Sequence, residues 1–83
     1  MYRIFISPEA KKGLKTIARL YRKGIAESIE SLKKDPFLGK PLVRELTGKY
    51  SYKVGVYRII YKVNKKDKII NILDAGHRAG IYQ

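Results

Sequence analysis

The residues best suited to chemistry in this sequence are cations set among apolar residues in one stretch, 49–63. This stretch, KYSYKVGVYRIIYKV, is rich in aromatic and β-branched residues, and Lys53 and Arg58 interrupt them. Arginine carries a planar, permanently charged guanidinium group that can bond two phosphate oxygens at once. We therefore interpret the stretch as a strand pair that presents positive charge to an anion.

A short tail behind this stretch adds groups that can carry charge or move protons. Its sequence is GHRAGIY, at 76–82. RNA can be cleaved without a metal because its own 2′-hydroxyl can attack the adjacent phosphate. The protein must then orient the chain, move two protons and stabilise the negative charge that builds on phosphorus. The candidate groups are Lys53, Arg58 and Arg78 for the charge, and Tyr82, His77 or a lysine for the protons.

Composition argues against several other kinds of site. The chain has no cysteine and one histidine, so a zinc site of three or four ligands is not expected. A two-metal site needs several carboxylates, and only Asp67 and Asp74 occur after residue 48. No GxxxxGK[ST] motif is present, which argues against nucleotide-driven work. We expect neither a metal nor a cofactor.

The overall charge indicates an anionic partner. Nineteen Lys and Arg residues against seven Asp and Glu give a net charge of +12. Nucleic acid, an acidic protein and an anionic membrane all fit such a charge. The membrane is the weakest of the three, because neither expected helix is cationic on one side and bulky apolar on the other. Without a signal peptide or a spanning segment, we expect a cytoplasmic protein.

The first half of the chain predicts a strand and two helices. A short strand is expected at 2–6, and Ser7-Pro8-Glu9 is a helix-start signal. Apolar residues at helical spacing then extend the first helix to Tyr21, and the basic residues and glycine at 22–24 are expected to end it. A second helix should run from residue 25 to Asp35-Pro36. The two helices are expected to form an antiparallel hairpin.

The second half predicts a sheet. The segment 37–48 has no sustained period and reads as a loop whose apolar residues tuck under the helices. Two strands joined by a turn at Gly55 follow, then a strand at 68–75 and a tail that folds back along the sheet. The predicted fold class is α+β, in a single domain (1–83). An N-terminal strand and an antiparallel helical hairpin pack on a four-stranded, mainly antiparallel sheet with a C-terminal β-meander.

Strand periodicity assigns the two faces of this sheet. Tyr57, Ile59, Tyr61 and Val63 should meet the helices, while Arg58, Ile60 and Lys62 should point away from them. A turn at 55–56 would bring Lys53 within a residue or two of a position opposite Arg58. One face is thus expected to be core and the other a positively charged floor.

The motif L-T-G-K-Y-S-Y-K-V-G-V-Y-R-I-I-Y-K-V at 46–63, followed by G-H-R-x-x-I-Y, resembles the RelE branch of the RelE/ParE toxins. These are toxins of bacterial and archaeal toxin–antitoxin modules, and the resemblance covers the whole chain. It implies a metal-independent endoribonuclease, an mRNA interferase, that cleaves mRNA in the ribosomal A site. The implied partners are the ribosome, its mRNA and a cognate acidic antitoxin.

The resemblance also implies roles for individual residues. Arg58 resembles the strand arginine that contacts the scissile phosphate, and Arg78 the arginine that stabilises the transition state. Tyr82 resembles the tyrosine that acts on the 2′-hydroxyl, and Lys53 the first of two strand lysines. The second lysine has no counterpart here, where Gly55 lies nearby. His77 is a further candidate for proton transfer, and Lys49 and Lys62 are candidates for nucleic-acid contact.

Two other functions stay open, and so do two other roles for single residues. A ParE-like toxin shares the fold but inhibits DNA gyrase and cuts no RNA. A degenerate basic binding module would serve only in an operator complex. At the level of single residues, Arg58 could pair with a carboxylate such as Asp74 on the neighbouring strand, and the tyrosines of 50–61 could be packing residues.

Overall fold

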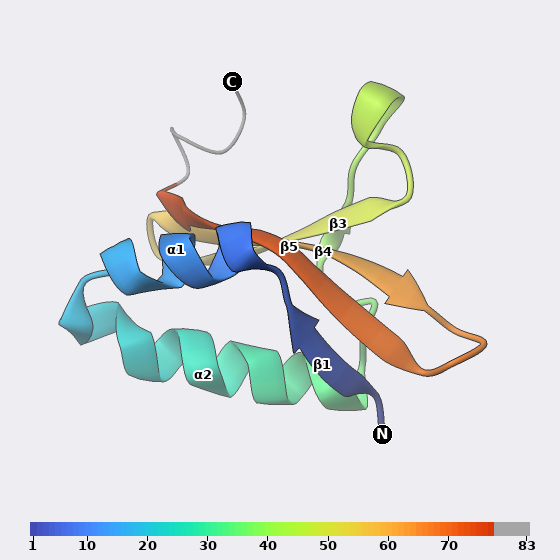
Figure 1. The fold of residues 1–83 in the computed structure, drawn as a ribbon, viewed down its shortest axis with the longest axis horizontal. Coiled ribbons are helices and arrows are strands. Elements are labelled where there is room, and N and C mark those ends of the chain that lie inside the picture. Colours follow the sequence, from blue (N-terminus) through green and yellow to red (C-terminus); the bar gives the residue numbers. More distant parts are fainter. Residues whose placement is uncertain (78–83) are drawn as a thin grey trace.

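Two helices cover one face of a five-stranded sheet in the computed structural model, which describes residues 1–77 (Figure 1). The strand order is β1-β5-β4-β3-β2. The elements are β1 (Arg3–Ile6), α1 (Pro8–Thr16), α2 (Arg19–Lys34), β2 (Lys40–Pro41), the 3₁₀ helix η1 (Arg44–Leu46), β3 (Lys49–Val54), β4 (Tyr57–Asn64) and β5 (Ile69–His77). The predicted α+β fold with a helical hairpin and a C-terminal meander is confirmed.

The prediction of four strands is corrected to five. The additional strand, β2, lies in the segment that was predicted to be a loop, and it pairs antiparallel with β3 at the edge of the sheet. Pro41 has no backbone N–H to donate, and an edge strand tolerates this loss. At the opposite edge β1 pairs with β5, and this is the one parallel pairing among the described strands.

The first helix begins where the sequence predicts. The Ser7 hydroxyl accepts a hydrogen bond from the Ala10 N–H at 3.0 Å and caps the helix. The same hydroxyl donates to the Leu73 carbonyl of β5 at 2.8 Å. This side chain therefore both starts α1 and ties it to the sheet.

The break between the helices comes earlier than predicted, at Ile17 and Ala18 instead of residues 22–24. The Ile17 carbonyl accepts a hydrogen bond from Arg22 Nε at 3.2 Å, and the Ala18 N–H donates to the hydroxyl of Tyr57 at 3.1 Å. A side chain from the next helical turn and one from β4 thus satisfy backbone groups that the break leaves open. Gly24 lies inside α2 and does not end a helix.

The core lies between the helices and the sheet. The buried apolar residues that form one cluster are Ala10, Ile17, Ile25 and Leu32 from the helical segment and Ile59, Tyr61, Ile70 and Ile72 from the sheet. Tyr57 and Val63 pack against this cluster, so the predicted inner face of β4 is confirmed. The apolar residues of 37–48 do not all tuck inside, since Leu38 is 47% exposed and Val43 is 71% exposed.

A β-bulge in β5 sets which side chains face the helices. Tyr61 lies opposite Ile72, but Ile60 lies opposite Asp74, so Leu73 is the extra residue. Beyond the bulge, Ala75 shares the inner face with Ile59. Without this extra residue, every later side chain of β5 would point to the other side of the sheet.

The hydroxyl of Tyr61 holds the segment after α2 against the sheet. It donates to the Pro36 carbonyl at 2.8 Å and accepts from the Gly39 N–H at 2.9 Å. These two bonds fix Pro36 and Gly39 against the sheet, while the Leu38 side chain between them is exposed to solvent. Burial raises the pKa of Tyr61 to about 12, although the hydrogen bond from Gly39 acts in the opposite direction.

Two helical glycines give a matched test of this packing. A Cβ on residue 13 would run into the Ala75 carbonyl oxygen, whereas a Cβ on residue 24 would meet only Val54 Cγ1, at 3.3 Å. Alanine favours a helix by about 1 kcal/mol over glycine at either site. We expect Gly13→Ala to destabilise the fold by roughly 2 kcal/mol or more, and Gly24→Ala to stay within about 1 kcal/mol of wild type. Urea denaturation would compare them, and equal free energies of unfolding would contradict this packing.

The raised pKa of Tyr61 predicts alkaline instability. The neutral form of Tyr61 is favoured in the folded state and so contributes to the free energy of unfolding. This contribution is complete below about pH 10 and is lost as the pH rises towards 12. The loss should reach roughly 2 to 3 kcal/mol across that window. Tyr61→Phe should be less stable by about 1 to 3 kcal/mol at pH 7 and should lack this part of the fall. Denaturation of both proteins from pH 9 to 12 would test this. If the free energy of unfolding fell by the same amount in wild type and Tyr61→Phe, this explanation would be contradicted.

Candidate functional site

Alternate residues of β3 and β4 point away from the helices and form what we call the far face of the sheet. Tyr50, Tyr52 and Val54 of β3 pack against the core cluster, so the residues between them must point the other way. The far face is defined by Lys49, Ser51 and Lys53 of β3 with their cross-strand partners Lys62, Ile60 and Arg58 of β4. Four of these six residues are cationic.

Lys53 and Arg58 lie directly opposite each other in the β3–β4 register, which confirms the pairing expected from the sequence. The two-residue turn at 55–56 makes this possible, because Gly55 has a φ of +60°. A Cβ on Gly55 would also lie 2.8 Å from Tyr21 Cε1. The turn therefore needs glycine for its backbone and for the close approach of an aromatic ring.

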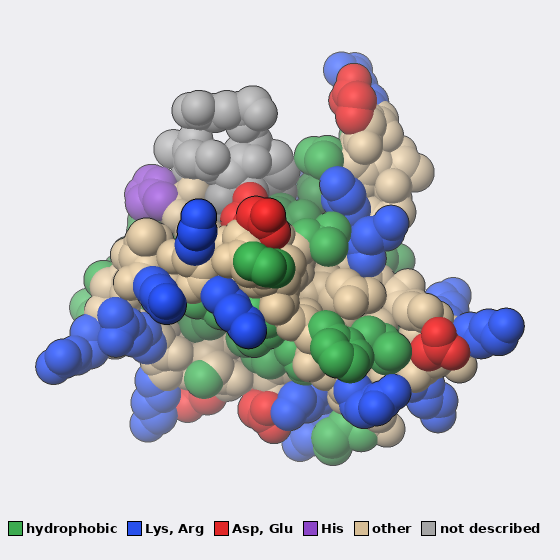
Figure 2. Space-filling view, in the orientation of Figure 1, with side chains coloured by type: hydrophobic (Ala, Val, Ile, Leu, Met, Phe, Trp, Pro, Cys, Tyr) green, Lys and Arg blue, Asp and Glu red, His purple; other side chains and the backbone are tan. Residues whose placement is uncertain are grey.

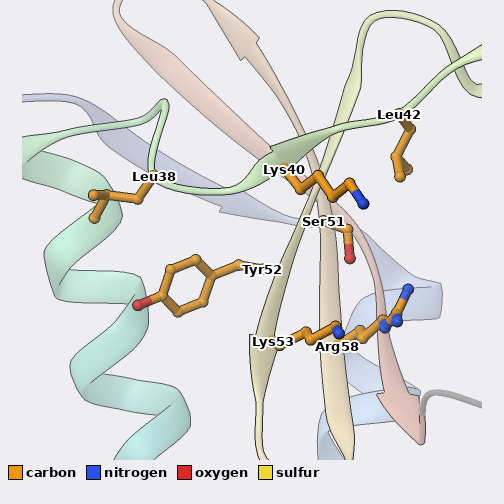
Figure 3. A pocket seen from close by; sticks show the side chains of 7 residues that line it. All are labelled: Leu38, Lys40, Leu42, Ser51, Tyr52, Lys53 and Arg58. Atoms are coloured by element: carbon orange, nitrogen blue, oxygen red, sulfur yellow. The ribbon is translucent and has the colours of Figure 1, made fainter.

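A hollow of about 650 Å³ adjoins this pair of cations (Figure 3). Its lining residues are Leu38, Lys40, Leu42, Ser51, Tyr52, Lys53 and Arg58. The cations come from three adjacent strands, since Lys40 lies in β2, Lys53 in β3 and Arg58 in β4. Like charges held together repel one another, and a bound anion would relieve that repulsion. The hollow thus suits an anionic group with an apolar portion beside it.

Sequence reasoning missed Lys40 and Ser51. Lys40 belongs to a two-residue strand, which is too short to show a period, and pairing opposite Ser51 brings it to the hollow. The alternation of β3 does place Ser51 on the same face as Lys53. That signal was available from the sequence, but a serine beside several cations does not draw attention.

Lys49 and Lys62 lie opposite each other at the other end of the β3–β4 pair. Both are on the far face with Lys53 and Arg58, so positive charge extends along the strands beyond the hollow. The spacing of 3.2–3.4 Å per strand residue puts roughly 13 Å between the two ends. Their predicted contact with nucleic acid stays a prediction.

The tail residues are only partly described. His77 ends β5 opposite Tyr57, and the two rings meet edge to face with centroids 6.0 Å apart. The bulge turns His77 towards the inner face, on the side of the sheet opposite Arg58. It belongs to β5 and not to a tail, which corrects the predicted end of that strand. Arg78 and Tyr82 lie outside the described residues.

Gly76 and Asp74 of β5 also lie on the far face. Gly76 is the residue opposite Arg58 in the β4–β5 register. Asp74 lies opposite Ile60, and its Oδ1 accepts a hydrogen bond from the Ala75 N–H at 2.8 Å. Within residues 1–77, no three His, Asp or Glu side chains gather as metal ligands would.

Positive charge is not confined to the far face. Figure 2 shows Lys and Arg side chains projecting around the rim of the molecule and over α1, with few acidic side chains among them. The 3₁₀ helix η1 stands away from the body of the molecule (Figure 1) and carries Arg44 at a φ of +59°. In residues 1–77 no helix is long and apolar enough to cross a membrane.

Comparison with known proteins identifies the family of the chain. Residues 4–82 match a family model described as ParE toxin of type II toxin–antitoxin system, parDE. Toxin RelG of Mycobacterium tuberculosis is 42% identical over 53 residues, which are 63% of this chain and 61% of that protein. The matched part therefore spans less than two thirds of that relative.

Two solved structures extend the likeness over nearly the whole chain. The toxin–antitoxin complex RelBE2 of M. tuberculosis matches with a TM-score of 0.83 and 29% identity, covering 93% of this chain and 98% of that one. The archaeal RelE–RelB complex of Pyrococcus horikoshii matches with a TM-score of 0.75 and 28% identity, covering 95% and 97%. This chain belongs to the RelE/ParE family of toxins from type II toxin–antitoxin systems.

Proposed function

We propose that the chain is a ribosome-dependent mRNA endoribonuclease that cleaves through the 2′-hydroxyl of its substrate and needs no metal. The observation that carries this proposal is the pairing of Lys53 with Arg58 beside a hollow of about 650 Å³. Two cations on facing residues can hold one phosphate group from two sides. The Toxin RelG and RelE likenesses favour the same branch of the family.

In the proposed reaction the 2′-oxygen attacks the adjacent phosphorus and the bond to the 5′-oxygen of the next nucleotide breaks. One proton leaves the 2′-hydroxyl and one reaches the departing oxygen, so the products carry a 2′,3′-cyclic phosphate and a 5′-hydroxyl. Lys53 and Arg58 would stabilise the charge that accumulates on the phosphate oxygens. We propose Arg78 as a further source of positive charge and Tyr82 as the group acting on the 2′-hydroxyl.

His77 is a less favourable candidate for proton transfer than the sequence alone suggests. Its ring contacts Tyr57 on the inner face, while the cations lie on the far face. A proton carrier must come within hydrogen-bond reach of the reacting oxygen. We therefore propose that His77 supports the end of β5 by packing against Tyr57.

The ribosome would supply the orientation that a chain of this size cannot. A net charge of +12 favours association with ribosomal RNA in the cytoplasm. Lys49 and Lys62 extend the positive far face beyond the hollow and would contact RNA phosphates outside the cut site. Binding energy from such remote contacts is available to position the scissile group.

We also propose a cognate acidic antitoxin as the partner that silences the toxin. The RelBE2 and P. horikoshii structures are toxin–antitoxin complexes by their own descriptions. An acidic chain lying over the far face would neutralise Lys53 and Arg58 and exclude RNA. Counterion release would make its affinity fall as salt rises.

Primer extension on translated mRNA would test the enzyme proposal through matched variants. Wild type should produce discrete cuts, and Arg58→Ala should cut roughly 10²-fold more slowly because charge stabilisation in the transition state is lost. Lys53→Ala should act in the same direction. Arg58→Lys keeps the charge but loses the forked geometry, so its rate should fall between those of wild type and Arg58→Ala.

Lys11→Ala is the control for charge alone. Lys11 is exposed on α1, away from the far face, and its loss changes the net charge by the same amount. We expect this variant and His77→Gln to cut nearly as fast as wild type. Equal cleavage rates for wild type, Arg58→Ala and Arg78→Ala would contradict the proposal.

DNA gyrase inhibition is the second candidate, because the matching family model is named for ParE toxins. A supercoiling assay with purified gyrase would separate the two. The leading proposal predicts no inhibition by the free toxin at concentrations that arrest translation. Inhibition that survives Arg58→Ala, together with intact mRNA, would favour the gyrase candidate. Growth that continues normally without the antitoxin would favour a binding module that has lost toxicity.

A further inference from the structure

Ser51 is an unusual residue on the far face because its hydroxyl is buried without a partner. The residue is 7% exposed. Within residues 1–77 its Oγ makes no hydrogen bond. Buried hydroxyl groups in proteins are nearly always hydrogen-bonded, because leaving water without compensation costs free energy. The position therefore needs an explanation that the free protein does not supply.

The surroundings of Ser51 leave one direction open to a partner. Lys40 of β2 and Ile60 of β4 flank it across the two neighbouring strands. Figure 3 shows its side chain pointing into the hollow, on the side where Lys40 and Arg58 also project. The backbone on either side is engaged in strand pairing, so a group in the hollow is the natural partner.

We infer that Ser51 Oγ is a phosphate-binding group of the hollow, donating a hydrogen bond to an RNA phosphodiester held by Lys53 and Arg58. The inference rests on the proposed function for the identity of the ligand as single-stranded RNA. Lys40 is the cross-strand partner of Ser51 on the adjoining strand and also lines the hollow. Its flexible, exposed side chain can move aside and contact the bound backbone.

The competing explanation is steric. A small side chain is needed opposite Lys40 and Ile60, and serine is small. Alanine would fill that space equally well and would leave no hydroxyl to satisfy. The two explanations make opposite predictions for RNA affinity when only the hydroxyl is removed, and this difference makes the inference testable.

The test measures binding without cleavage and without ribosomes. The probe is a fluorescent single-stranded RNA whose 2′-oxygens are all methylated, so that no cut can occur. Fluorescence anisotropy at low salt would give Kd for wild type, Ser51→Ala and Ser28→Ala, and thermal unfolding would give Tm for each. Ser28 is the matched control, because its Oγ donates to the Gly24 carbonyl at 2.7 Å within α2.

We expect Ser51→Ala to raise Kd about tenfold, equivalent to about 1.4 kcal/mol. Its Tm should be equal to or above that of wild type, because a hydroxyl without a partner does not stabilise the fold. Ser28→Ala should leave Kd unchanged. An unchanged Kd for Ser51→Ala, or a lower Tm showing that the hydroxyl does have a partner, would overturn the inference. Failure of wild type to bind the probe would overturn it as well.

The result is independent of the outcome on the ribosome. If wild type binds the probe and Ser51→Ala binds it more weakly, the inference stands even when primer extension shows no cuts. If wild type cuts mRNA and Ser51→Ala binds the probe normally, only the inference about Ser51 fails. The two proposals can therefore fail separately.

Discussion

The register of the β3–β4 hairpin is the constraint on which both the core and the candidate site depend. The same strand places Ile59 and Tyr61 in the core and Arg58 on the far face. A slip of one residue would exchange these sets and bury the guanidinium group among apolar side chains. The two-residue turn at Gly55 and the hydrogen bonds of the Tyr61 hydroxyl oppose such a slip, so the features that stabilise the fold also position the cations.

The bulge in β5 makes a second adjustment. It brings Gly76 opposite Arg58 and turns His77 towards Tyr57. A strand without the bulge would bring the His77 side chain to the far face and the carboxylate of Asp74 to the inner one. Ser7 donates its hydroxyl to the carbonyl of the bulged residue, Leu73, so the start of α1 and the irregularity of β5 are coupled. The helical layer thus holds the extra residue of β5, on which the facing of Gly76 and His77 depends.

Much of this arrangement could be predicted from the sequence, because strand alternation and turn chemistry are local signals. The inner face of β4, the Gly55 turn and the opposition of Lys53 and Arg58 all followed from residues 49–63. What could not be predicted depends on tertiary contacts or on elements too short to show a period. The helix break at Ile17–Ala18 is satisfied by Arg22 and Tyr57, β2 has only two residues, and the bulge at Leu73 shows no local sign. Lys40 and the orientation of His77 were missed for these reasons.

We propose that this toxin cleaves mRNA through the 2′-hydroxyl of the substrate while its own cations stabilise the phosphate. The most direct measurement is of cleavage on ribosomes that translate an mRNA with a single 2′-deoxy nucleotide on the 5′ side of the mapped cut. The account predicts that this substitution abolishes the cut and that unmodified mRNA yields a 2′,3′-cyclic phosphate end. Cleavage of the deoxy substrate at the same position and rate would contradict the account.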